Sequence, residues 1–488
     1  MLTKANLKEL VKSKLGESLF IVASNREPYV HTYKEDRIDC QRPASGMAIA
    51  LDSVMQACGG VWVAHGSGDA DRETVDEKDK TQVPPVSPRY TLRRVWMSKE
   101  EEERYYYGLS NETFWPLCHI VYVRPKFEEA DWNTYKKINE RFAEAILEEA
   151  AGQKAFVWLQ DFHLSLVPKI LKEKRPDMVT AHFWHIPWPN PEAFRICPWK
   201  EEILEGLLAN DVIGFHTRYN CNNFLDTIDQ TLEAKTDRDL YSVSHKGSTT
   251  LVKPFPIGVD YKYISDLSNT PETEMEMVQI RRKYNLKDSI VGVGVERIDY
   301  TKGIPERFKA IDRFLDKYPE YQGRFVFIQL GAPSRIYIDA YKKINDEIEA
   351  LADDINWKYR RDHWKPIIFI GEYHDMNRII ACYKLANICI VSSLHDGMNL
   401  VAKEYIAAQN DASGMLLLSR FAGSARELQE AILINPYDTE KFADAIKEGV
   451  EMPAEEKKTR MEKMRETVKE NNIYKWAWDV VSSLTRLS

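Results

Sequence analysis

The sequence has 488 residues, of which 44% are hydrophobic and 29% are charged, and its formal net charge is −8. This composition supports a packed core divided into two or three domains, and it argues against a disordered chain or a broad nucleic-acid-binding surface. The seven cysteines form no CxxC pair, and no apolar run approaches the ~20 residues of a membrane helix. We therefore expect a cytoplasmic protein with reduced cysteines and with neither a membrane nor a nucleic acid as its partner.

Short apolar runs that end in polar residues alternate with amphipathic segments in the first half of the chain. The runs over 19–23, 155–159, 179–184 and 212–215 are typical of buried parallel strands. The clearest helical periodicity lies over 139–151. Ligands of open α/β sheets bind at the carboxyl ends of strands, so the polar residues after these runs are candidate site residues.

A long segment follows the first apolar run, and we expect it to be a loop. It contains Arg26 near its start and ends in a turn of small residues at Gly46. Loops longer than ~12–15 residues are often functional. Arg26 is suited to hold a phosphate and Gly46 to let the backbone approach a diphosphate. The alternative is an exposed loop without a ligand.

Aromatic residues are dense over 105–116, where Tyr106 and Trp115 are candidates for contacts with a sugar phosphate. Such aromatic residues are more often part of the core, and their positions in the sequence do not decide between the two roles.

Asp161 and His163 follow the run at 155–159, and His182 lies within the run at 179–184 that His185 follows. The four residues are compatible with a zinc site, as in a metal-dependent hydrolase. The histidine spacing and the crowding by tryptophan and proline favour a polar sugar pocket instead. We predict a buried, hydrogen-bonded role for His182 and a functional role for His185.

A second series of apolar runs covers 290–295, 325–330, 367–370, 388–391 and 415–419. Two prolines and a glycine over 254–258 indicate a hinge between the two series. The predicted domains are therefore 1–256 and 257–472. An aromatic-rich tail over 473–488 is expected to form a helix that crosses back to the first domain.

Two cations follow the first run of the second series. Arg297 and Lys302 precede a helix expected to start near Pro305. Cations beside a helix N-terminus suit a diphosphate and would stabilise its charge when it leaves. A surface network of Arg, Asp and Lys explains the same residues equally well.

A glycine-containing loop follows the run at 388–391 and separates two carboxylates. Asp396 lies in this loop, and Glu404 lies on the helix expected to start near Asn399. Loop amides can face a phosphate, and carboxylates can accept hydrogen bonds from sugar hydroxyls. The alternative is a helix cap and a solvated helix residue, but the length of the string Asp-Gly-Met-Asn-Leu-Val-Ala-Lys-Glu favours the binding role.

Five strings together resemble the trehalose-6-phosphate synthases: GVERIDYTKGIPERF, HDGMNLVAKEY, HIPWPNPEAF, SNETFWP and INPYD. These enzymes are retaining glycosyltransferases of the GT-B fold, an α/β fold in which two Rossmann-like domains face each other across a substrate cleft. The resemblance extends from Phe20 to Trp478. It implies transfer of glucose from UDP-glucose to glucose 6-phosphate, which gives α,α-trehalose 6-phosphate and UDP.

The resemblance also assigns roles to the candidate residues. It implies catalytic roles for His185, Arg297, Lys302 and Asp161. The residues matched to the donor site are Gly46, Arg297, Lys302, Asp396, Gly397, Met398, Asn399, Leu400, Val401 and Glu404. The residues matched to the acceptor site are Arg26, Tyr106, Trp115, Asp161 and Arg335.

The reaction implied by the family takes place on one face of the sugar, with a leaving phosphate oxygen helping to deprotonate the acceptor hydroxyl. No cofactor and no metal are expected. A separate trehalose-6-phosphate phosphatase is expected to act downstream, and a homo-oligomer is compatible with the sequence, which does not indicate the preferred nucleotide among UDP, GDP and ADP.

Two positions depart from the family pattern. His65 stands where many of these synthases carry Trp, and Ser45 stands where a second glycine is common. A glucosylglycerol-phosphate synthase, which uses glycerol 3-phosphate, is therefore the first alternative, although Arg335 keeps the trehalose pattern. A catalytically silent sugar-phosphate sensor is the second alternative.

Overall fold

The computed structural model describes residues 1–35, 37–42, 46–361 and 363–484, which form two compact units. Unit 1 comprises Met1–Ile257 and Ile473–Ser488, and unit 2 comprises Gly258–Asn472. The chain therefore passes from one unit to the other beside the proline-rich segment in which the sequence indicates a hinge.

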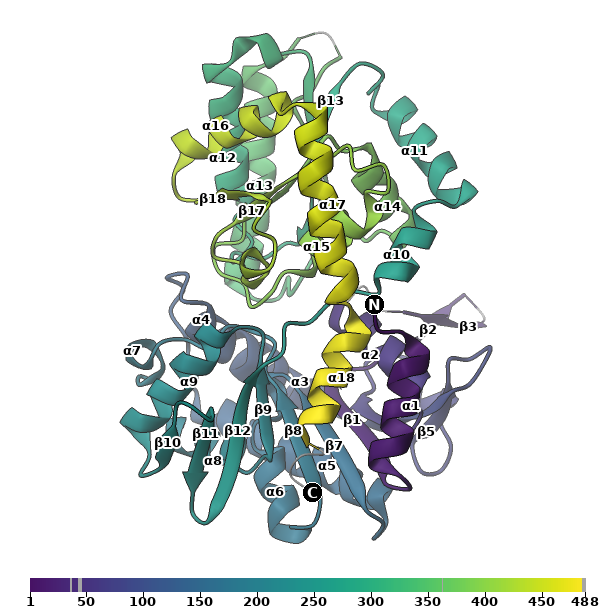
Figure 1. Ribbon diagram of the computed structural model, residues 1–488, viewed down its shortest axis with the longest axis vertical. Coiled ribbons are helices and arrows are strands. Elements are labelled where there is room, and N and C mark those ends of the chain that lie inside the picture. Colours follow the sequence, from purple (N-terminus) through teal and green to yellow (C-terminus); the bar gives the residue numbers. More distant parts are fainter. Residues whose placement is uncertain (36, 43–45, 362, 485–488) are drawn as a thin grey trace. The chain divides into compact units, whose positions relative to one another are not determined.

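Within its described residues, unit 1 is built on a ten-stranded sheet of order β10-β11-β12-β9-β8-β7-β1-β4-β6-β5 (Figure 1). The strands from β12 to β6 in this order are parallel, and β5, β10 and β11 are antiparallel additions at the edges. The bounds are β1 (Leu19–Arg26), β4 (Val61–His65), β5 (Lys80–Val83), β6 (Tyr90–Val95), β7 (Ala155–Gln160), β8 (Val179–Phe183), β9 (Val212–Phe215), β10 (Lys235–Asp237), β11 (Ser242–His245) and β12 (Ser248–Pro254).

The segment after β1 is only partly the loop that we expected. It contains β2 (Val30–Lys34) and β3 (Arg37–Gln41), which pair antiparallel as a separate two-stranded sheet. Val30, Thr32 and Tyr33 in β2 and Ile38 in β3 are residue types that favour a strand over a loop.

The helices of unit 1 are α1 (Lys4–Leu15), α2 (Gly46–Cys58), α3 (Lys99–Glu102), α4 (Trp115–His119), α5 (Glu129–Ala150), α6 (Val167–Lys174), α7 (Pro191–Phe194), α8 (Lys200–Leu208), α9 (Arg218–Thr231) and α18 (Ile473–Leu484). A π-helix, η2 (Glu103–Phe114), leads into α4. The ring of Trp476 on α18 packs against Trp158 on β7, with centroids 4.6 Å apart, which accounts for part of the aromatic tail. None of the described helices is both long enough and apolar enough to span a membrane.

Over its described residues, unit 2 has a six-stranded, fully parallel sheet of order β15-β14-β13-β16-β17-β18. Its strands are β13 (Ile290–Arg297), β14 (Phe325–Ala332), β15 (Ile367–Ile370), β16 (Ile388–Val391), β17 (Met415–Ser419) and β18 (Ile432–Ile434). Its helices are α10 (Tyr261–Leu267), α11 (Pro271–Lys283), α12 (Ile304–Lys317), α13 (Asp339–Lys358), α14 (Met376–Leu385), α15 (Leu400–Ala408), α16 (Thr439–Glu451) and α17 (Ala454–Glu470).

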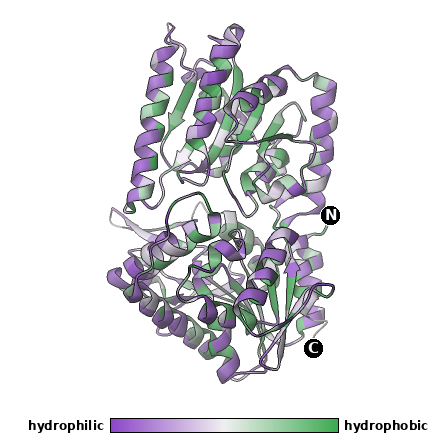
Figure 2. Cartoon of the chain, turned by 90° about the vertical axis from the view of Figure 1, so that its left-hand side faces the viewer, coloured by the Kyte–Doolittle hydropathy of each residue, from purple (hydrophilic) through white to green (hydrophobic). Residues whose placement is uncertain are grey.

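The continuous apolar runs of unit 2 arise because both faces of its sheet are covered. Alternate strand residues enter two hydrophobic clusters: Val326 and Ile328 join α10, α11, α14, α15 and α17, whereas Phe325 and Phe327 join α12, α13 and α16. Figure 2 shows mainly hydrophobic strands beside helices that mix hydrophobic and hydrophilic residues. Because both faces are buried, each strand is a continuous apolar run that can be recognised in the sequence.

The two parallel sheets share one topology. When the parallel strands of each unit are numbered along the chain, unit 2 reads 3-2-1-4-5-6, and unit 1 contains the same series with one further strand. This is the Rossmann order, in which ligands bind where the strand order reverses. The reversal lies between β1 and β7 in unit 1 and between β13 and β16 in unit 2.

Candidate active site

In unit 1, the predicted acceptor-side residues gather at the point where the strand order reverses. Arg26 is the last residue of β1, and Asp161 directly follows the adjacent strand β7. His185 follows β8, the next strand in the sheet. The carboxyl ends of parallel strands lie at one edge, so the topology brings together residues that are distant in sequence.

Arg26 and Tyr106 form one polar pair. The Nη2 group of Arg26 donates a hydrogen bond to the Tyr106 hydroxyl at 3.0 Å. The ring of Tyr106 stacks on the His163 ring, with centroids 6.0 Å apart. An exposed guanidinium beside a phenol hydroxyl is suited to bind a phosphate group.

The π-helix η2 carries Tyr106 to this position. The wide turns of a π-helix change the backbone hydrogen bonds, and here the side-chain amide of Asn111 donates to the Tyr106 carbonyl at 2.6 Å. Trp115 begins α4 directly after η2 and is 6% exposed, with its ring 4.2 Å from the ring of His119. Tyr106 is therefore only partly buried at the sheet edge, whereas Trp115 is mostly enclosed.

Asp161 and His185 are joined by a hydrogen bond. The carboxylate of Asp161 accepts from the backbone N–H of His185 at 3.1 Å, and Asp161 has a φ of 67°, which is rare for a residue with a side chain. The Nε2 atom of His185 lies 2.9 Å from the side-chain oxygen of Gln160. Burial, together with the neighbouring His216, lowers the pKa of His185 well below its usual value. His185 is therefore neutral at pH 7 and acts as a hydrogen-bonding group rather than as a cation.

The metal-dependent hydrolase alternative finds no support in this geometry. Buried His182 donates from Nε2 to the backbone carbonyl of Asp161 at 2.9 Å, and burial lowers the pKa of His182 to about 4. Among the residues that the structure describes, no three His, Cys, Asp or Glu side chains are grouped as metal ligands would be. His182 thus has the structural role that we expected.

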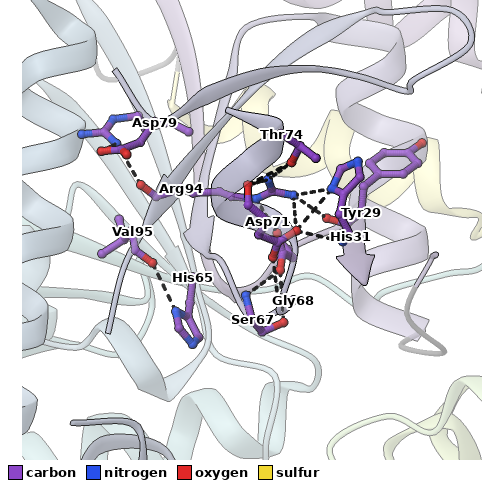
Figure 3. A network of polar contacts seen from close by, with 12 residues as sticks. Tyr29, His31, His65, Ser67, Gly68, Asp71, Thr74, Asp79, Arg94 and Val95 are labelled. Carbon is purple, nitrogen blue, oxygen red and sulfur yellow. Dashed lines mark hydrogen bonds and ion pairs between the residues drawn. The ribbon is translucent and has the colours of Figure 1, made fainter. Parts of the chain in front are cut away.

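Figure 3 shows a network of polar contacts around Arg94, which includes Glu27, the residue after Arg26 in the chain. Arg94 on β6 is fully buried, and it pairs with Glu27 at 2.9 Å and with Asp71 at 2.7 Å. The same guanidinium lies 2.8 Å from Nδ1 of His31. Glu27 also accepts from the Ser67 backbone N–H at 2.8 Å. The residue that follows Arg26 is therefore tied to β6 and to the turn after β4.

Burial is the main reason why the pKa of Glu27 rises to about 8. The nearby Asp71 raises it further, and Arg94 lowers it in part. Asp71 accepts hydrogen bonds from His31, which help to hold the pKa of Asp71 below its usual value despite burial. The network thus favours an ionised Asp71 and a Glu27 that holds its proton near neutral pH.

Of the two departures from the family pattern, His65 lies beside Arg26 in the sheet. His65 ends β4 and is paired in register with Arg26, and its Nδ1 atom lies 3.2 Å from the Val95 carbonyl oxygen. Burial lowers the pKa of His65, so its ring is neutral at pH 7. Ser45 lies outside the described residues. Gly46, predicted to approach the donor, is the first residue of α2.

In unit 2, the predicted donor residues also gather where the strand order reverses. Arg297 is the last residue of β13, and Lys302 lies between β13 and α12. Asp396 follows β16, the strand beside β13, and its carboxylate lies 2.6 Å from Nζ of Lys302. The loop after β13 and the loop after β16 therefore meet in a direct ion pair.

The loop after β16 is shaped by polar side chains. Asp396 also accepts from the Asn399 amide and the Ser393 hydroxyl, each at 3.2 Å. Asn399 has a φ of 79° and caps α15 by accepting from the Ala402 N–H at 3.1 Å. Gly397 and Met398 are buried within this loop, and Leu400 and Val401 start the helix. A capped helix N-terminus at a sheet edge is suited to bind a phosphate.

Glu404 lies further along α15. Its carboxylate accepts from the Tyr383 hydroxyl at 3.2 Å. Burial raises the pKa of Glu404, and this hydrogen bond lowers it in part. Glu404 is therefore a second acceptor of hydrogen bonds on the same segment as Asp396, in a less polar setting.

Arg307 lies beneath the donor residues and was not among the predicted site residues. It pairs with Glu296 at 2.5 Å, donates to Gln329 at 2.6 Å and donates to the Ser392 hydroxyl at 3.1 Å. A Cβ at Gly294 would lie 2.2 Å from its guanidinium, so a larger residue at this strand position would displace Arg307. Arg307 thus fixes the strand end that carries Arg297.

Arg335 follows β14 and belongs to unit 2, unlike the other predicted acceptor residues. It has a φ of 49° and pairs with the buried carboxylate of Asp299 at 3.3 Å. The structure thus groups Arg26, Tyr106, Asp161 and His185 in unit 1. It groups Lys302, Asp396 and Arg335, with their connecting loops, in unit 2.

Three comparisons with known proteins agree with this arrangement. The model of glycosyltransferase family 20 matches residues 18–486. The trehalose-6-phosphate synthase of Mycobacterium avium (strain 104) is 35% identical over 477 residues, which cover 96% of this chain and 96% of that protein. An E. coli structure bound with UDP-2-fluoro glucose matches with a TM-score of 0.85 and 30% identity, over 96% of this chain and 99% of that chain. A Burkholderia xenovorans synthase in complex with glucose-6-phosphate matches with a TM-score of 0.86 and 27% identity, over 96% and 100% of the two chains.

Two Rossmann-like units with cations and carboxylates at their switch points define a glycosyltransferase of the GT-B class, as predicted from the sequence. The chain belongs to glycosyltransferase family 20.

Proposed function

We propose that the protein transfers glucose from UDP-glucose to glucose 6-phosphate with retention at the anomeric carbon, giving α,α-trehalose 6-phosphate and UDP. The observation that carries the proposal is the meeting of Lys302 and Asp396 at the switch point of unit 2, at a distance of 2.6 Å, in a chain of family 20. A cation and a carboxylate side by side can bind the diphosphate and the sugar hydroxyls of one nucleotide sugar.

The cationic residues are assigned to the phosphate groups, and the carboxylates are assigned to the sugar hydroxyls. Arg297 and Lys302 stabilise the negative charge that develops on the leaving diphosphate, and the N-terminus of α15 adds backbone N–H groups. Asp396 orients the donor glucose and Glu404 the ribose. On the acceptor side, Arg26, Tyr106 and Arg335 hold the phosphate, and Trp115 packs beside them.

Asp161 and His185 contact the sugars near the reacting carbon. Because His185 is neutral at pH 7, it stabilises hydroxyl groups by hydrogen bonding. The acceptor proton passes to the leaving phosphate oxygen, so the protein contributes positioning and charge stabilisation rather than a dedicated base. The cleft in which the substrates meet stays a prediction of the resemblance, as does the cytoplasmic location. A downstream trehalose-6-phosphate phosphatase is part of the same proposal.

One substrate matrix tests this function. UDP, GDP and ADP glucose would each be combined with glucose 6-phosphate, glycerol 3-phosphate or no acceptor, and release of the nucleoside diphosphate would be measured with and without EDTA. We expect release from UDP-glucose only with glucose 6-phosphate, and no effect of EDTA. Release with glycerol 3-phosphate alone would identify the glucosylglycerol-phosphate alternative, and no release with any pair would favour the sensor.

A further inference from the structure

Asp299 lies between the cation predicted to bind the acceptor phosphate and the loop that carries the donor cations. It is fully buried directly after β13. Its Oδ2 atom accepts from Arg335 at 3.3 Å and from the Tyr341 hydroxyl at 3.1 Å. Its Oδ1 atom accepts from the Thr301 backbone N–H and from the Thr301 hydroxyl, both at 2.9 Å. Each oxygen of one carboxylate therefore serves a different side of the site.

The Thr301 side continues without a break to the donor loop. The backbone N–H of Lys302 donates to the carbonyl of Asp299 at 3.0 Å, and the N–H of Leu394 donates to the carbonyl of Thr301 at 2.7 Å. The Nζ group of Lys302 then pairs with Asp396 at 2.6 Å. A chain of direct polar contacts thus joins the Arg335 side to the donor residues, entirely within unit 2.

The Arg335 side is held equally closely. Tyr341 also contacts the Arg335 guanidinium through its hydroxyl, and that guanidinium lies over the Tyr341 ring, 5.2 Å from its centroid. Tyr341 is 1% exposed. Because Arg335 itself has a left-handed backbone, its direction depends on these partners rather than on a regular element.

Asp299 is a shared counter-ion for the cations around it. Burial alone would raise its pKa, but the charges of Arg335, Lys302 and Arg297 and the Thr301 N–H together hold the pKa below its usual value. The carboxylate is therefore ionised at neutral pH. The single negative charge of Asp299 therefore interacts with three cations. Arg297 and Lys302 are predicted to bind the donor diphosphate, and Arg335 is predicted to bind the acceptor phosphate.

We propose that Asp299 is a positioning residue for both substrates and couples their binding. One oxygen directs Arg335 towards the acceptor phosphate, and the other fixes the loop from Thr301 to Lys302 for the donor diphosphate. A ligand on either side restrains the same carboxylate, so it prepares the other side and the coupling is positive. This inference rests on the proposed function, because that function supplies the two phosphate ligands.

The test compares three variants by calorimetry, with UDP titrated in the absence and presence of saturating glucose 6-phosphate. For the wild type we expect glucose 6-phosphate to tighten UDP binding about fivefold or more, the lower range of common allosteric couplings. Asp299→Asn keeps the size of the side chain but loses the charge. It should weaken both ligands about tenfold and abolish the coupling, since charge-assisted hydrogen bonds are lost on both sides.

Two single-sided variants separate positioning from a general structural role. Tyr341→Phe should weaken glucose 6-phosphate binding several-fold and leave UDP binding alone unchanged. Thr301→Val should weaken UDP binding several-fold and leave the binding of glucose 6-phosphate alone unchanged. Both variants keep Asp299 and change one hydroxyl, so they also serve if Asp299→Asn does not fold.

Three results would overturn the inference. A folded Asp299→Asn protein could bind both ligands with unchanged affinity, or Tyr341→Phe and Thr301→Val could each weaken both ligands equally. The third result is a wild-type affinity for UDP that does not change when glucose 6-phosphate is added. A failure of the proposed function looks different. In that case the wild type binds UDP and glucose 6-phosphate in the calorimeter, but it releases no UDP when UDP-glucose and glucose 6-phosphate are supplied together.

Discussion

Arg297 and Lys302 stand at the end of β13 and just after it, and Lys302 is paired with Asp396 at 2.6 Å. The carboxylate of Asp396 holds the ammonium group of Lys302 in place, and a bound diphosphate would contact the same ammonium group. The proposed chemistry therefore depends on charge that is already oriented at the switch point. Arg307 and Asp299 supply that orientation from below, and neither contacts solvent to a significant extent.

The first residue-scale prediction concerns Arg297. Arg297→Ala removes a donor that stabilises the leaving diphosphate, so turnover should fall about a hundredfold or more. The circular dichroism spectrum and melting temperature should stay close to those of the wild type. An unchanged turnover number would remove Arg297 from the mechanism, and wild-type turnover that is already undetectable would favour the sensor.

The second prediction concerns Glu27, whose pKa rises to about 8 chiefly through burial. An acid whose folded-state pKa lies above its unfolded value stabilises the fold at low pH, and this stabilisation is lost as the pH rises through the folded-state pKa. The melting temperature should therefore fall as the pH rises from about 4.5 to about 8, and this contribution should level off above pH 8. Glu27→Gln mimics the protonated acid and should flatten this part of the profile. A wild-type profile as flat as that of the variant would contradict the assignment.

The third prediction compares two arginines on α12. Arg307→Met leaves the carboxylate of Glu296 buried without its cation, which typically costs about 3–5 kcal/mol. Arg313→Met breaks the pair with Glu440 at 2.6 Å, but Arg313 is 37% exposed, and water screens such a surface pair, so its loss should change the stability far less. Thermal and urea unfolding should therefore show a much larger loss for Arg307→Met. Equal losses would mean that the buried network is not a stabilising element.

At the scale of elements, short helices and turns place the functional groups. The π-helix η2 places Tyr106, and the capped start of α15 places the loop from Asp396 to Asn399. The sequence predicts a helix near Asn399 because a polar residue precedes an apolar pattern. It gives no comparable sign of the π-helix, because such helices are rare and their i→i+5 hydrogen bonds leave no periodicity that the sequence analysis could use.

An element-scale prediction concerns the cap of α15. Asn399→Gly tolerates the φ of 79° but loses the side chain that caps the helix and contacts Asp396. We expect the KM for UDP-glucose to rise several-fold while the KM for glucose 6-phosphate stays unchanged.

Thr217→Ala is the matched control for that variant. It removes the cap of α9 in unit 1, where the Thr217 side chain accepts from the Asn220 N–H at 3.3 Å. The stability loss of Thr217→Ala should be about 1 kcal/mol, at least as large as that of Asn399→Gly, without a change in the KM for UDP-glucose. A rise in that KM for the control alone would contradict the role assigned to Asn399.

At the scale of the whole molecule, two copies of one topology explain why much of the fold could be predicted. The central strands are buried on both faces, so their apolar runs identify them in the sequence. Arg297, Asp161 and Asp396 lie at or just after the carboxyl ends of these runs, which made them candidate site residues. The pairing of Arg94 with Glu27 and the pairing of Asp299 with Arg335 could not be predicted. Each depends on which distant segment packs behind a charged residue, and a charged residue on a strand or loop looks exposed until that partner is known.

The most direct test of the central claim is an NMR analysis of the product formed from UDP-glucose and glucose 6-phosphate by the full chain. We expect a disaccharide phosphate with both anomeric carbons in the α configuration and joined through one oxygen, formed in step with UDP. A β linkage, a product built on another acceptor, or UDP release with free glucose as the only sugar product would contradict it.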